Sequence, residues 1–521
     1  MVVRRLPDVF VSFLILLTLS CGGGSSNGNN FVPQNPTPPP SNPPQQLVPL
    51  TRISSDTFTA APGQHASQVE PHAYAFGSTI VSAFQVGRIN AGGGVAIGFS
   101  TSTNGGVSWT NGSLPGLTTA FQNGSFTAAS DPVVAYDSAH GQWLISTLPI
   151  GTPVRVAVSR SRDGITWDNP IFVSNTPNAD KNWIACDNTS TSPHFGNCYQ
   201  IWDDPSQNGL IFLSTSSDGG ATWSAATNTA DGAQGLGVVP VIQPNGNVIV
   251  PYMKFGTQTN PVSNQMAFRS TDGGATWGVS APISSITDHA QAGNLRSSPL
   301  PTAQADSTGK IYVLWQDCRF RTNCSSDDIV MSTSLDGLVW TAPVRIPLDP
   351  TTSTVDHFIP SLAVDSATGA STAHLAFLYY FYPETNCTAT TCSLNIGFVT
   401  SQDGGASWTT PITLVSGMLL SSLPSTLSGV MVGDYFATVF SSGRAFPIFA
   451  VANLPSGSTL NQAMFTTTAG QQVLATSRAF VTQAERAISN ATSDHPPSRY
   501  YDLDREHPMK QPPLRRMLRK K

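Results

Sequence analysis

Ser216-Ser217-Asp218-Gly219-Gly220-Ala221-Thr222-Trp223 is one of three complete copies of a pattern that occurs six times in this chain. Each copy ends on a tryptophan, at Trp109, Trp167, Trp223, Trp277, Trp340 and Trp408. The copies ending at Trp167 and Trp340 are one residue shorter than the others. Successive tryptophans lie 58, 56, 54, 63 and 68 residues apart, and strand-like runs surround each one. Repeats of this spacing in a β-rich chain predict a propeller or a comparable array of sheets.

Each copy predicts a tight hairpin turn. Glycines such as Gly219 supply the positive φ that such a turn needs, and the oxygens of Ser216 and Asp218 can accept hydrogen bonds from the turn's own backbone. Trp223 then begins the next strand and brings a large apolar surface to bury. Because each turn would satisfy its own aspartate, we expect these aspartates to stabilise the fold rather than to act as catalytic acids or metal ligands.

The template Ser-x-Asp-x-Gly-x-Thr-Trp resembles the Asp box, or BNR repeat, of the sialidase superfamily. The resemblance covers about residues 50 to 470, and the copies ending at Trp223, Trp277 and Trp408 fit the template in full. It implies an all-β fold, a β-propeller of four-stranded blades with each box between a blade's third and fourth strands. It also implies that the boxes lie on the face opposite the substrate site.

The strand pattern predicts seven blades. Three strand-like runs precede each box and one follows it, and a further boxless set (433–439, 445–452 and 462–467) lacks a fourth strand. Residues 47–54 resemble the fourth strands of later blades, so we expect this N-terminal strand to complete the last blade and close the ring. The alternative is six blades, as in sialidases. Prolines that mark the expected start of the first strand in five blades are Pro71, Pro132, Pro240, Pro301 and Pro360.

The ends of the chain predict export. Residues 1–21 read as a lipoprotein-type signal peptide with lipobox Cys21, although ordinary secretion is the alternative. A Gly/Ser/Asn/Pro-rich linker (22–46), the propeller (47–468) and a disordered basic tail (469–521) follow. A lipid on Cys21 would attach the protein to the cell envelope, at the outer membrane or cell surface, without a membrane span.

Composition narrows the class of partner. The net charge is −5 and only 11% of residues are charged, which gives no case for nucleic-acid binding. We expect a monomer. An even number of cysteines in an exported chain favours disulfides, and the pairs that are closest in sequence are Cys186 with Cys198, Cys318 with Cys324 and Cys387 with Cys392. No Cys-x-x-Cys motif supports the alternative of a zinc site.

The candidate site is the channel mouth opposite the boxes. Residues expected to enter the first strands, or to lie in loops at the same end, are Glu70, Asp131, Asp180, Lys181, Arg296, Trp315, Asp317, Arg319, Arg321, Asp356, His357, Asp434 and Tyr435. This mixture of carboxylates, arginines and tryptophans suits a glycan or glycoconjugate. The alternative is that these charges simply pair with one another around a wet channel.

The chemistry expected there is that of a glycosidase. Glu70, Asp131 and Asp356 are the candidate acid, base or nucleophile. Arg296 with Arg319 or Arg321 would hold a ligand carboxylate, and Glu70 with Tyr435 would correspond to the Tyr–Glu nucleophile pair that the sialidase resemblance implies.

Three further expectations complete this reading. Arg52 and Arg345 precede an Ile as in a sialidase arginine motif, but they fall on expected outer strands, so we assign them no site role. No cofactor is required, and Ca²⁺ is the metal that converging aspartates could bind.

The sequence therefore predicts either a sialidase-like glycoside hydrolase or a non-catalytic binding and assembly module.

Overall fold

The computed structural model describes residues 43–173, 178–256 and 262–474. The predicted signal peptide with Cys21, most of the predicted linker and most of the predicted tail therefore lie outside the described residues. Regular structure in the described part consists of strands and short 3-10 turns, and no helix there is long and apolar enough to cross a membrane.

The strands in chain order are β1 (Gln45–Gln46), β2 (Leu50–Arg52), β3 (Gly63–Phe76), β4 (Thr79–Ile89), β5 (Gly94–Ser102), β6 (Thr110–Ser113), β7 (Ala128–Asp137), β8 (Gln142–Ile150), β9 (Ala157–Ser161), β10 (Ile171–Phe172), β11 (Asp180–Cys186), β12 (Cys198–Asp204), β13 (Leu210–Ser216), β14 (Val241–Ile242), β15 (Val248–Lys254), β16 (Asn264–Ser270), β17 (Ala281–Ser285), β18 (Thr302–Ala305), β19 (Ile311–Asp317), β20 (Asp328–Ser334), β21 (Val344–Arg345), β22 (Asp356–Val364), β23 (Leu375–Tyr382), β24 (Ser393–Ser401), β25 (Ile412–Leu419), β26 (Ser425–Thr426), β27 (Gly429–Val430), β28 (Ala437–Ser441), β29 (Arg444–Ser456), β30 (Thr459–Thr467) and β31 (Gln471–Gln472). The 3-10 turns are η1 (Pro205–Gln207), η2 (Ala292–Asn294), η3 (Thr322–Cys324), η4 (Ala370–Thr372) and η5 (Leu420–Ser422).

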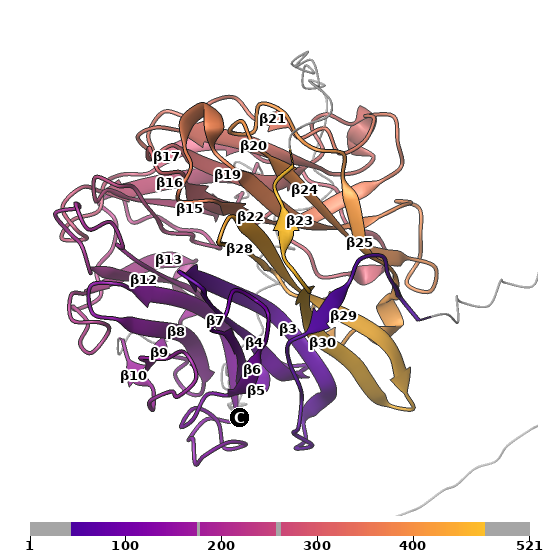
Figure 1. The fold of residues 1–521 in the computed structure, drawn as a ribbon, viewed down its shortest axis with the longest axis horizontal. Coiled ribbons are helices and arrows are strands. Elements are labelled where there is room, and N and C mark those ends of the chain that lie inside the picture. The colour runs from indigo at the N-terminus through magenta and orange to yellow at the C-terminus, as the bar shows by residue number, and fades with distance from the viewer. Residues whose placement is uncertain (1–42, 174–177, 257–261, 475–521) are drawn as a thin grey trace, which may run out of the picture. The chain divides into compact units, whose positions relative to one another are not determined.

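Consecutive strands form antiparallel sheets along the chain (Figure 1). The sheets run β3 to β6, β7 to β10, β11 to β13, β14 to β17, β18 to β21, β22 to β25 and β28 to β30, and a single bridge between Gly94 and Ala129 links the first two. The fold is therefore all-β, as the repeat pattern predicts.

The N-terminal segment pairs with the C-terminal strands. Leu50 lies opposite Thr467 and Arg52 opposite Phe465, so β2 becomes the outer strand beside β30, as the sequence predicts. Gln45–Gln46, at the end of the predicted linker, pair with β25 of the preceding sheet. In Figure 1 the indigo start of the chain accordingly lies beside the yellow strands.

The first strands of successive sheets contact one another in chain order. Contacts join β3 to β7, β7 to β11, β11 to β14, β14 to β18, β18 to β22, β22 to β28 and β28 to β3. The first and last sheets also share a hydrophobic core in which Ile80 and Phe84 of β4 pack with Phe446 and Ile448 of β29.

The box turns satisfy their own polar groups. In the third copy, Oδ1 of Asp218 accepts hydrogen bonds from Ala221 N at 3.0 Å and Thr222 N at 2.9 Å, and Oδ2 accepts one from Thr222 Oγ1 at 2.6 Å. Burial acts to raise the pKa of Asp218, but these hydrogen bonds lower it overall. These hydrogen bonds confirm the prediction that Asp218 stabilises its own turn. The tryptophans of later copies, Trp277 and Trp408, are buried in hydrophobic cores.

The prolines occupy different positions from those expected. Pro71, Pro132 and Pro360 lie inside strands β3, β7 and β22 rather than at their starts, and Pro240 and Pro301 immediately precede β14 and β18. Each internal proline sits at a β-bulge, where the pairing register with the next strand shifts. The bulge interrupts the ladder at a residue that has no N–H to donate.

The residue before each internal proline has a positive φ. The values are 53° for Glu70, 48° for Asp131 and 48° for Ile359, and Lys181, at the corresponding bulge of β11, has 39°. Such conformations are uncommon for residues other than glycine and persist only where the surroundings impose them. They bring three charged side chains into one cluster.

Candidate functional site

Five buried residues from distant parts of the chain meet in what we call the charged cluster. They are Glu70, Asp131, Lys181, Arg296 and Asp434. Lys181 stands at the centre, since its Nζ lies 3.8 Å from Oε1 of Glu70 and 3.9 Å from Oδ2 of Asp131, and it donates a hydrogen bond to Oδ2 of Asp434. All five were singled out from the sequence.

Arg296 is committed to Asp434 within this cluster. Its Nε donates to Oδ1 at 2.7 Å and its Nη2 donates to Oδ2, which is the two-pronged geometry of a guanidinium and a carboxylate. Burial opposes ionisation of Asp434, yet Arg296 and Lys181 lower its pKa well below the usual range. Asp434 is therefore ionised at neutral pH, and Arg296 already holds a carboxylate of the protein.

Glu70 has the opposite character. Gln85 Nε2 donates to its Oε2, and the Asp434 backbone N–H donates to its Oε1 at 3.3 Å. Burial raises the pKa of Glu70 well above its usual value, and although Lys181 acts against this, Asp131 and Asp434 reinforce it. The raised pKa favours the protonated form of Glu70, which reduces the excess of negative charge in the cluster.

Gln85 and Ser130 extend this network, and sequence reasoning missed both. Gln85 Nε2 also lies 3.1 Å from Ser130 Oγ, which in turn donates to Oδ1 of Asp131 at 2.5 Å. The amide thereby connects the two candidate acids. The Ser-Asp-Pro sequence around Asp131 could have pointed to Ser130, whose hydroxyl stands next to the candidate acid. Gln85 lies on a strand, and nothing in the sequence distinguishes it.

A central cavity of about 1010 Å³ adjoins the charged cluster. Lys181, Asp434 and Tyr435 line it at one end, and the turns that contain Gly77 and Gly443 line it at the other. The second end is the box end, because Gly105 of the first box donates a backbone hydrogen bond to Ser78 at 2.8 Å.

The two ends of the cavity differ in exposure. Gly77 and Gly443 are exposed, whereas Lys181 and Asp434 are buried. The sequence predicted an open mouth ringed by these charges on the box-free side. Instead, the charged residues at that end are buried and paired with one another, so we call it the closed end of the cavity.

Three aromatic side chains form a wall of the central cavity, which we call the aromatic wall. The Trp183 ring lies 5.3 Å from the Tyr435 ring and 4.9 Å from the His72 ring, both in edge-to-face arrangements, and all three residues line the cavity. Tyr435 also donates to the backbone oxygen of Pro132 at 3.3 Å. Burial raises the pKa of Tyr435 well above its usual value and lowers that of His72 to about 3. Both rings are therefore neutral, hydrogen-bonding surfaces at neutral pH.

Residues 199–360 match the family model described as the BNR repeat-like domain. The resemblance to BNR repeats that the box sequences indicate is therefore confirmed over this part of the chain. A comparison with curated proteins found no match.

Solved structures with a similar chain path include several carbohydrate-active proteins. A Hadza microbial sialidase shares 15% identity and a TM-score of 0.41, covering 73% of this chain and 74% of its own. An α-L-arabinofuranosidase from Fusarium graminearum shares 16% identity and a TM-score of 0.39, covering 67% and 97%. An ulvan lyase from a new family of polysaccharide lyases shares 11% identity and a TM-score of 0.46, covering 83% and 97%.

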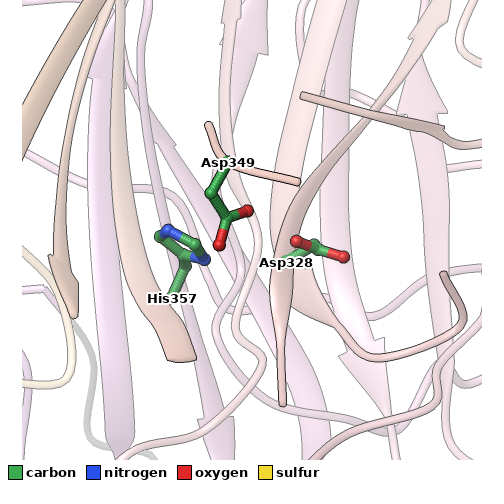
Figure 2. A group of neighbouring side chains, drawn as sticks. All are labelled: Asp328, Asp349 and His357. Atoms are coloured by element: carbon green, nitrogen blue, oxygen red, sulfur yellow. The ribbon is translucent and has the colours of Figure 1, made fainter. Parts of the chain in front are cut away.

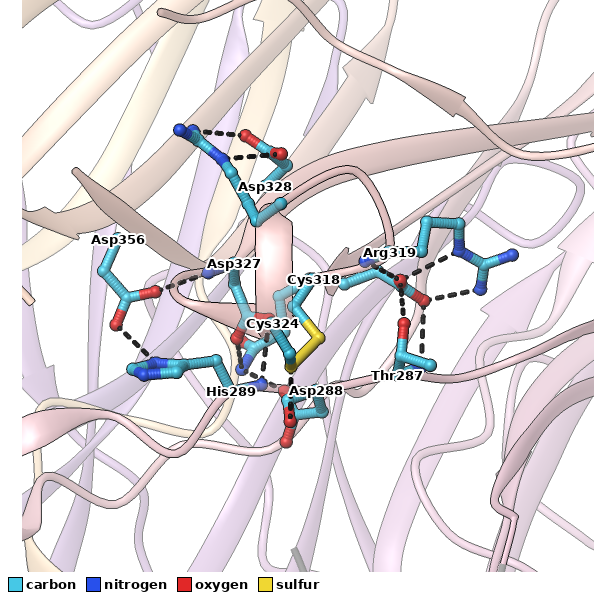
Figure 3. Close-up of a disulfide and its surroundings, with 12 residues drawn as sticks. Thr287, Asp288, His289, Cys318, Arg319, Cys324, Asp327, Asp328 and Asp356 are labelled. Atoms are coloured by element: carbon cyan, nitrogen blue, oxygen red, sulfur yellow. Dashed lines mark hydrogen bonds and ion pairs between the residues drawn. A yellow bond between two sulfur atoms is a disulfide. The ribbon is translucent and has the colours of Figure 1, made fainter. Parts of the chain in front are cut away.

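Arg319, another predicted site residue, lies beside the Cys318–Cys324 disulfide, in the part of the chain that matches the BNR model (Figure 3). Arg319 pairs with Asp317, with its Nε 2.8 Å from Oδ1 and its Nη2 2.6 Å from Oδ2. The buried Trp315 also donates to Asp317, at 3.1 Å. Arg319 and Asp317 are thus paired with each other and lie outside the charged cluster.

Arg321 and His357 belong to a third group, shown in part in Figure 2. Ligand atoms of Asp328, Asp349 and His357 lie within 4.8 Å of one another, the spacing of a metal site. However, Arg321 Nη2 lies 2.6 Å from Asp328 and 2.7 Å from Asp349, and Arg345 Nε lies 2.9 Å from Asp328. Two guanidinium groups already neutralise these carboxylates, so the group does not fit a divalent cation. Arg345 lies on the outer strand β21 and forms one of these ion pairs.

Asp356 lies apart from Glu70 and Asp131, in an acidic cluster with Asp288 and Asp327. Its Oδ1 accepts from Asp327 N at 2.7 Å, and its Oδ2 lies 3.3 Å from Nδ1 of His289. Burial, together with Asp288 and Asp356, raises the pKa of Asp327 well above its usual value. Sequence reasoning missed Asp288 and Asp327. The adjacent polar pairs Asp288-His289 and Asp327-Asp328 could have pointed to them.

Asp180 and the cysteines complete the predicted set. Asp180 is buried at the start of β11, where its Oδ1 accepts from Lys181 N at 2.9 Å and so fixes the bulge that carries Lys181. The three disulfides join Cys186 to Cys198, Cys318 to Cys324 and Cys387 to Cys392. The pairing inferred from closeness in sequence is confirmed.

Proposed function

We propose that this protein binds the end of a neutral glycan in the central cavity. The observation that carries the proposal is the cavity's construction, with exposed turns at the box end, an aromatic wall of His72, Trp183 and Tyr435, and the polar groups of Lys181 and Asp434 at the closed end. Aromatic faces and fixed polar groups together suit a sugar ring. A cavity that is closed at one end accommodates a chain end rather than a continuous strand.

The charge balance favours a neutral ligand. Arg296, Arg319 and Arg321 are each paired with an aspartate of the protein, so an acidic sugar would have to displace a bidentate ion pair. In this proposal Arg296 positions Asp434 for hydrogen bonding to hydroxyls instead of holding a ligand carboxylate.

Hydrolysis of a glycosidic bond is the second candidate function. The raised pKa of Glu70 favours its protonated form, and Oε1 of Glu70 and Oδ2 of Asp131 both lie within 4 Å of Nζ of Lys181. These two oxygens are therefore less than about 8 Å apart, below the upper limit of roughly 9.5 Å for the carboxyl pairs of glycosidases. Glu70 would act as the acid and Asp131 as the base or nucleophile. Bound Ca²⁺ is not needed for either function.

We also propose the cellular setting and the full architecture. The sheets would form a seven-bladed propeller closed by β2, in keeping with the cyclic contacts of the first strands. A lipid on Cys21 and the linker that follows would hold this propeller at the cell envelope. The disulfides of the described part and its lack of a membrane-crossing helix are compatible with export.

A glycan array tests the binding proposal. The wild-type protein should bind neutral glycans in preference to sialylated ones, and Trp183→Ala should reduce that binding. Binding of neither class of glycan, or a strict preference for sialylated glycans, would contradict the binding proposal. For hydrolysis, the bound glycans are incubated with wild type, Glu70→Gln and Asp131→Asn. Released sugar that depends on both carboxylates supports hydrolysis, and its absence leaves a binding module.

A further inference from the structure

A second pocket of about 520 Å³ lies over the Cys318–Cys324 loop. We call it the threonine pocket, because most residues that line it are threonine or serine. The other lining residues are His289, Phe320, Asn323, Cys324 and Asn386. No residue lines both this pocket and the central cavity.

The threonine pocket is built from loops at the box-free end of the sheets. His289 precedes β18 and the segment 351–354 precedes β22, while the Cys318–Cys324 loop and Thr385 follow second strands. In antiparallel sheets these connections lie at the end opposite the third-to-fourth turns, where the boxes are. The pocket therefore faces away from the exposed end of the central cavity.

The walls of the threonine pocket are held rigidly. The Cys318–Cys324 disulfide fixes one wall. The segment 350–353 forms another, and the buried Arg321 holds it through hydrogen bonds to the backbone oxygens of Pro350 at 3.0 Å and Ser353 at 3.2 Å. Thr385 N donates to Thr354 O at 3.0 Å and so joins the third wall to the second. A pocket that is already ordered loses little conformational entropy when a ligand binds.

His289 is the one titratable side chain in this lining, and its ring is oriented from behind. Its Nδ1 lies 3.3 Å from Oδ2 of the buried Asp356, which Asp327 N fixes through the other oxygen (Figure 3). The backbone N–H of His289 also donates to Asp327 at 3.0 Å. These contacts hold the imidazole against the pocket in a defined orientation.

We infer that the threonine pocket is a second carbohydrate site, which binds a neutral hexopyranose unit. Hydroxyl and amide side chains can both donate and accept hydrogen bonds, as sugar hydroxyls require. Among the residues that the structure describes, the lining includes no aspartate, glutamate, lysine or arginine, so a charged ligand would meet no carboxylate, ammonium or guanidinium group in the lining itself. Phe320 supplies an apolar face and His289 an oriented polar group. The inference goes beyond the proposed function, because the two sites share no residue.

Saturation-transfer NMR with the full chain and three probes tests the inference. The probes are the methyl glycosides of glucose, galactose and mannose. We expect at least one to bind, and Thr352→Trp, which places a large ring in the pocket from an exposed position, to weaken that binding more than tenfold. Thr119→Trp, a matched change at an exposed threonine in the connection between β6 and β7, should leave it unchanged. Asn386→Trp provides a second block if Thr352→Trp does not fold.

Each result separates this site from the central cavity. Binding that survives Trp183→Ala but not Thr352→Trp supports the threonine pocket. Binding that is lost in Trp183→Ala and kept in Thr352→Trp and Asn386→Trp overturns the inference while supporting the proposed function. If no methyl glycoside binds, the inference is also overturned, whatever the glycan array gives for the central cavity.

Discussion

Nε of Arg296 lies 2.7 Å from Oδ1 of Asp434. Arg296 belongs to the connection that leads from the fourth strand of one sheet to β18, whereas Asp434 lies just before β28. Lys181 adds a third segment to the same carboxylate. The charged cluster therefore ties together sheets that lie far apart in sequence, and it closes one end of the central cavity as it does so.

Removing Lys181 should destabilise the fold strongly. Lys181→Met leaves Glu70, Asp131 and Asp434 buried without their shared cation, and breaking a buried ion pair in this way costs about 3–5 kcal/mol. Urea unfolding of wild type and variant measures the difference in the free energy of unfolding. The control is Lys254→Met at an exposed lysine, which we expect to change it by less than about 0.5 kcal/mol. Equal effects of the two changes would refute a stabilising role for the cluster.

Glu70 should make stability depend on pH in a characteristic direction. Because burial raises its folded-state pKa, the folded protein keeps a proton that the unfolded chain releases above its ordinary value of about 4.3. This contribution to stability is fully present below that value and is lost as the pH rises towards the folded pKa. Wild type should therefore lose stability relative to Glu70→Gln as the pH rises above about 4.3, as thermal unfolding can measure. Parallel curves for the two proteins would mean that Glu70 is ionised in the folded state.

The box aspartates should matter for stability and not for binding. Asp218→Ala removes the acceptor of four hydrogen bonds in one turn, which should cost about 1 kcal/mol in the free energy of unfolding. Glycan binding should remain as in wild type, because this residue contacts neither pocket. Asp168→Ala, at an exposed aspartate outside the turn, is the control for stability. Loss of binding in a folded Asp218→Ala protein would argue against a purely structural box.

The disulfides should be found as three local pairs in the purified protein. Peptide mapping without reduction should recover Cys186 linked to Cys198, Cys318 to Cys324 and Cys387 to Cys392. Serine replacement of both Cys318 and Cys324 should weaken methyl glycoside binding more than it affects the central cavity, because that disulfide forms a wall of the threonine pocket. Recovery of a cross-linked pair from two different loops would contradict the structure.

The sequence predicts the repeated parts of this molecule well. Each box carries its turn chemistry within eight residues, and each cysteine pair closes a short loop, so both follow from local sequence. The members of the charged cluster were also found, since Glu70 and Asp131 precede prolines in the same register of their repeats.

The sequence could not predict which charges pair. Arg296 and Asp434 are 138 residues apart, and only the folded arrangement of the sheets brings them together. For the same reason Arg319 was grouped with the charged cluster, whereas it pairs locally with Asp317. Glu70, Asp131 and Lys181 lie at β-bulges with positive φ and are buried, whereas the sequence predicts that they ring an open mouth.

The most direct test of the account is a calorimetric titration of a neutral oligosaccharide identified on the array. We predict that wild type and Asp218→Ala bind it equally, and that Trp183→Ala, which removes the centre of the aromatic wall, binds it roughly tenfold more weakly, about 1.4 kcal/mol. Unchanged affinity in a folded Trp183→Ala protein would contradict the central claim that the cavity beside the charged cluster is the glycan site.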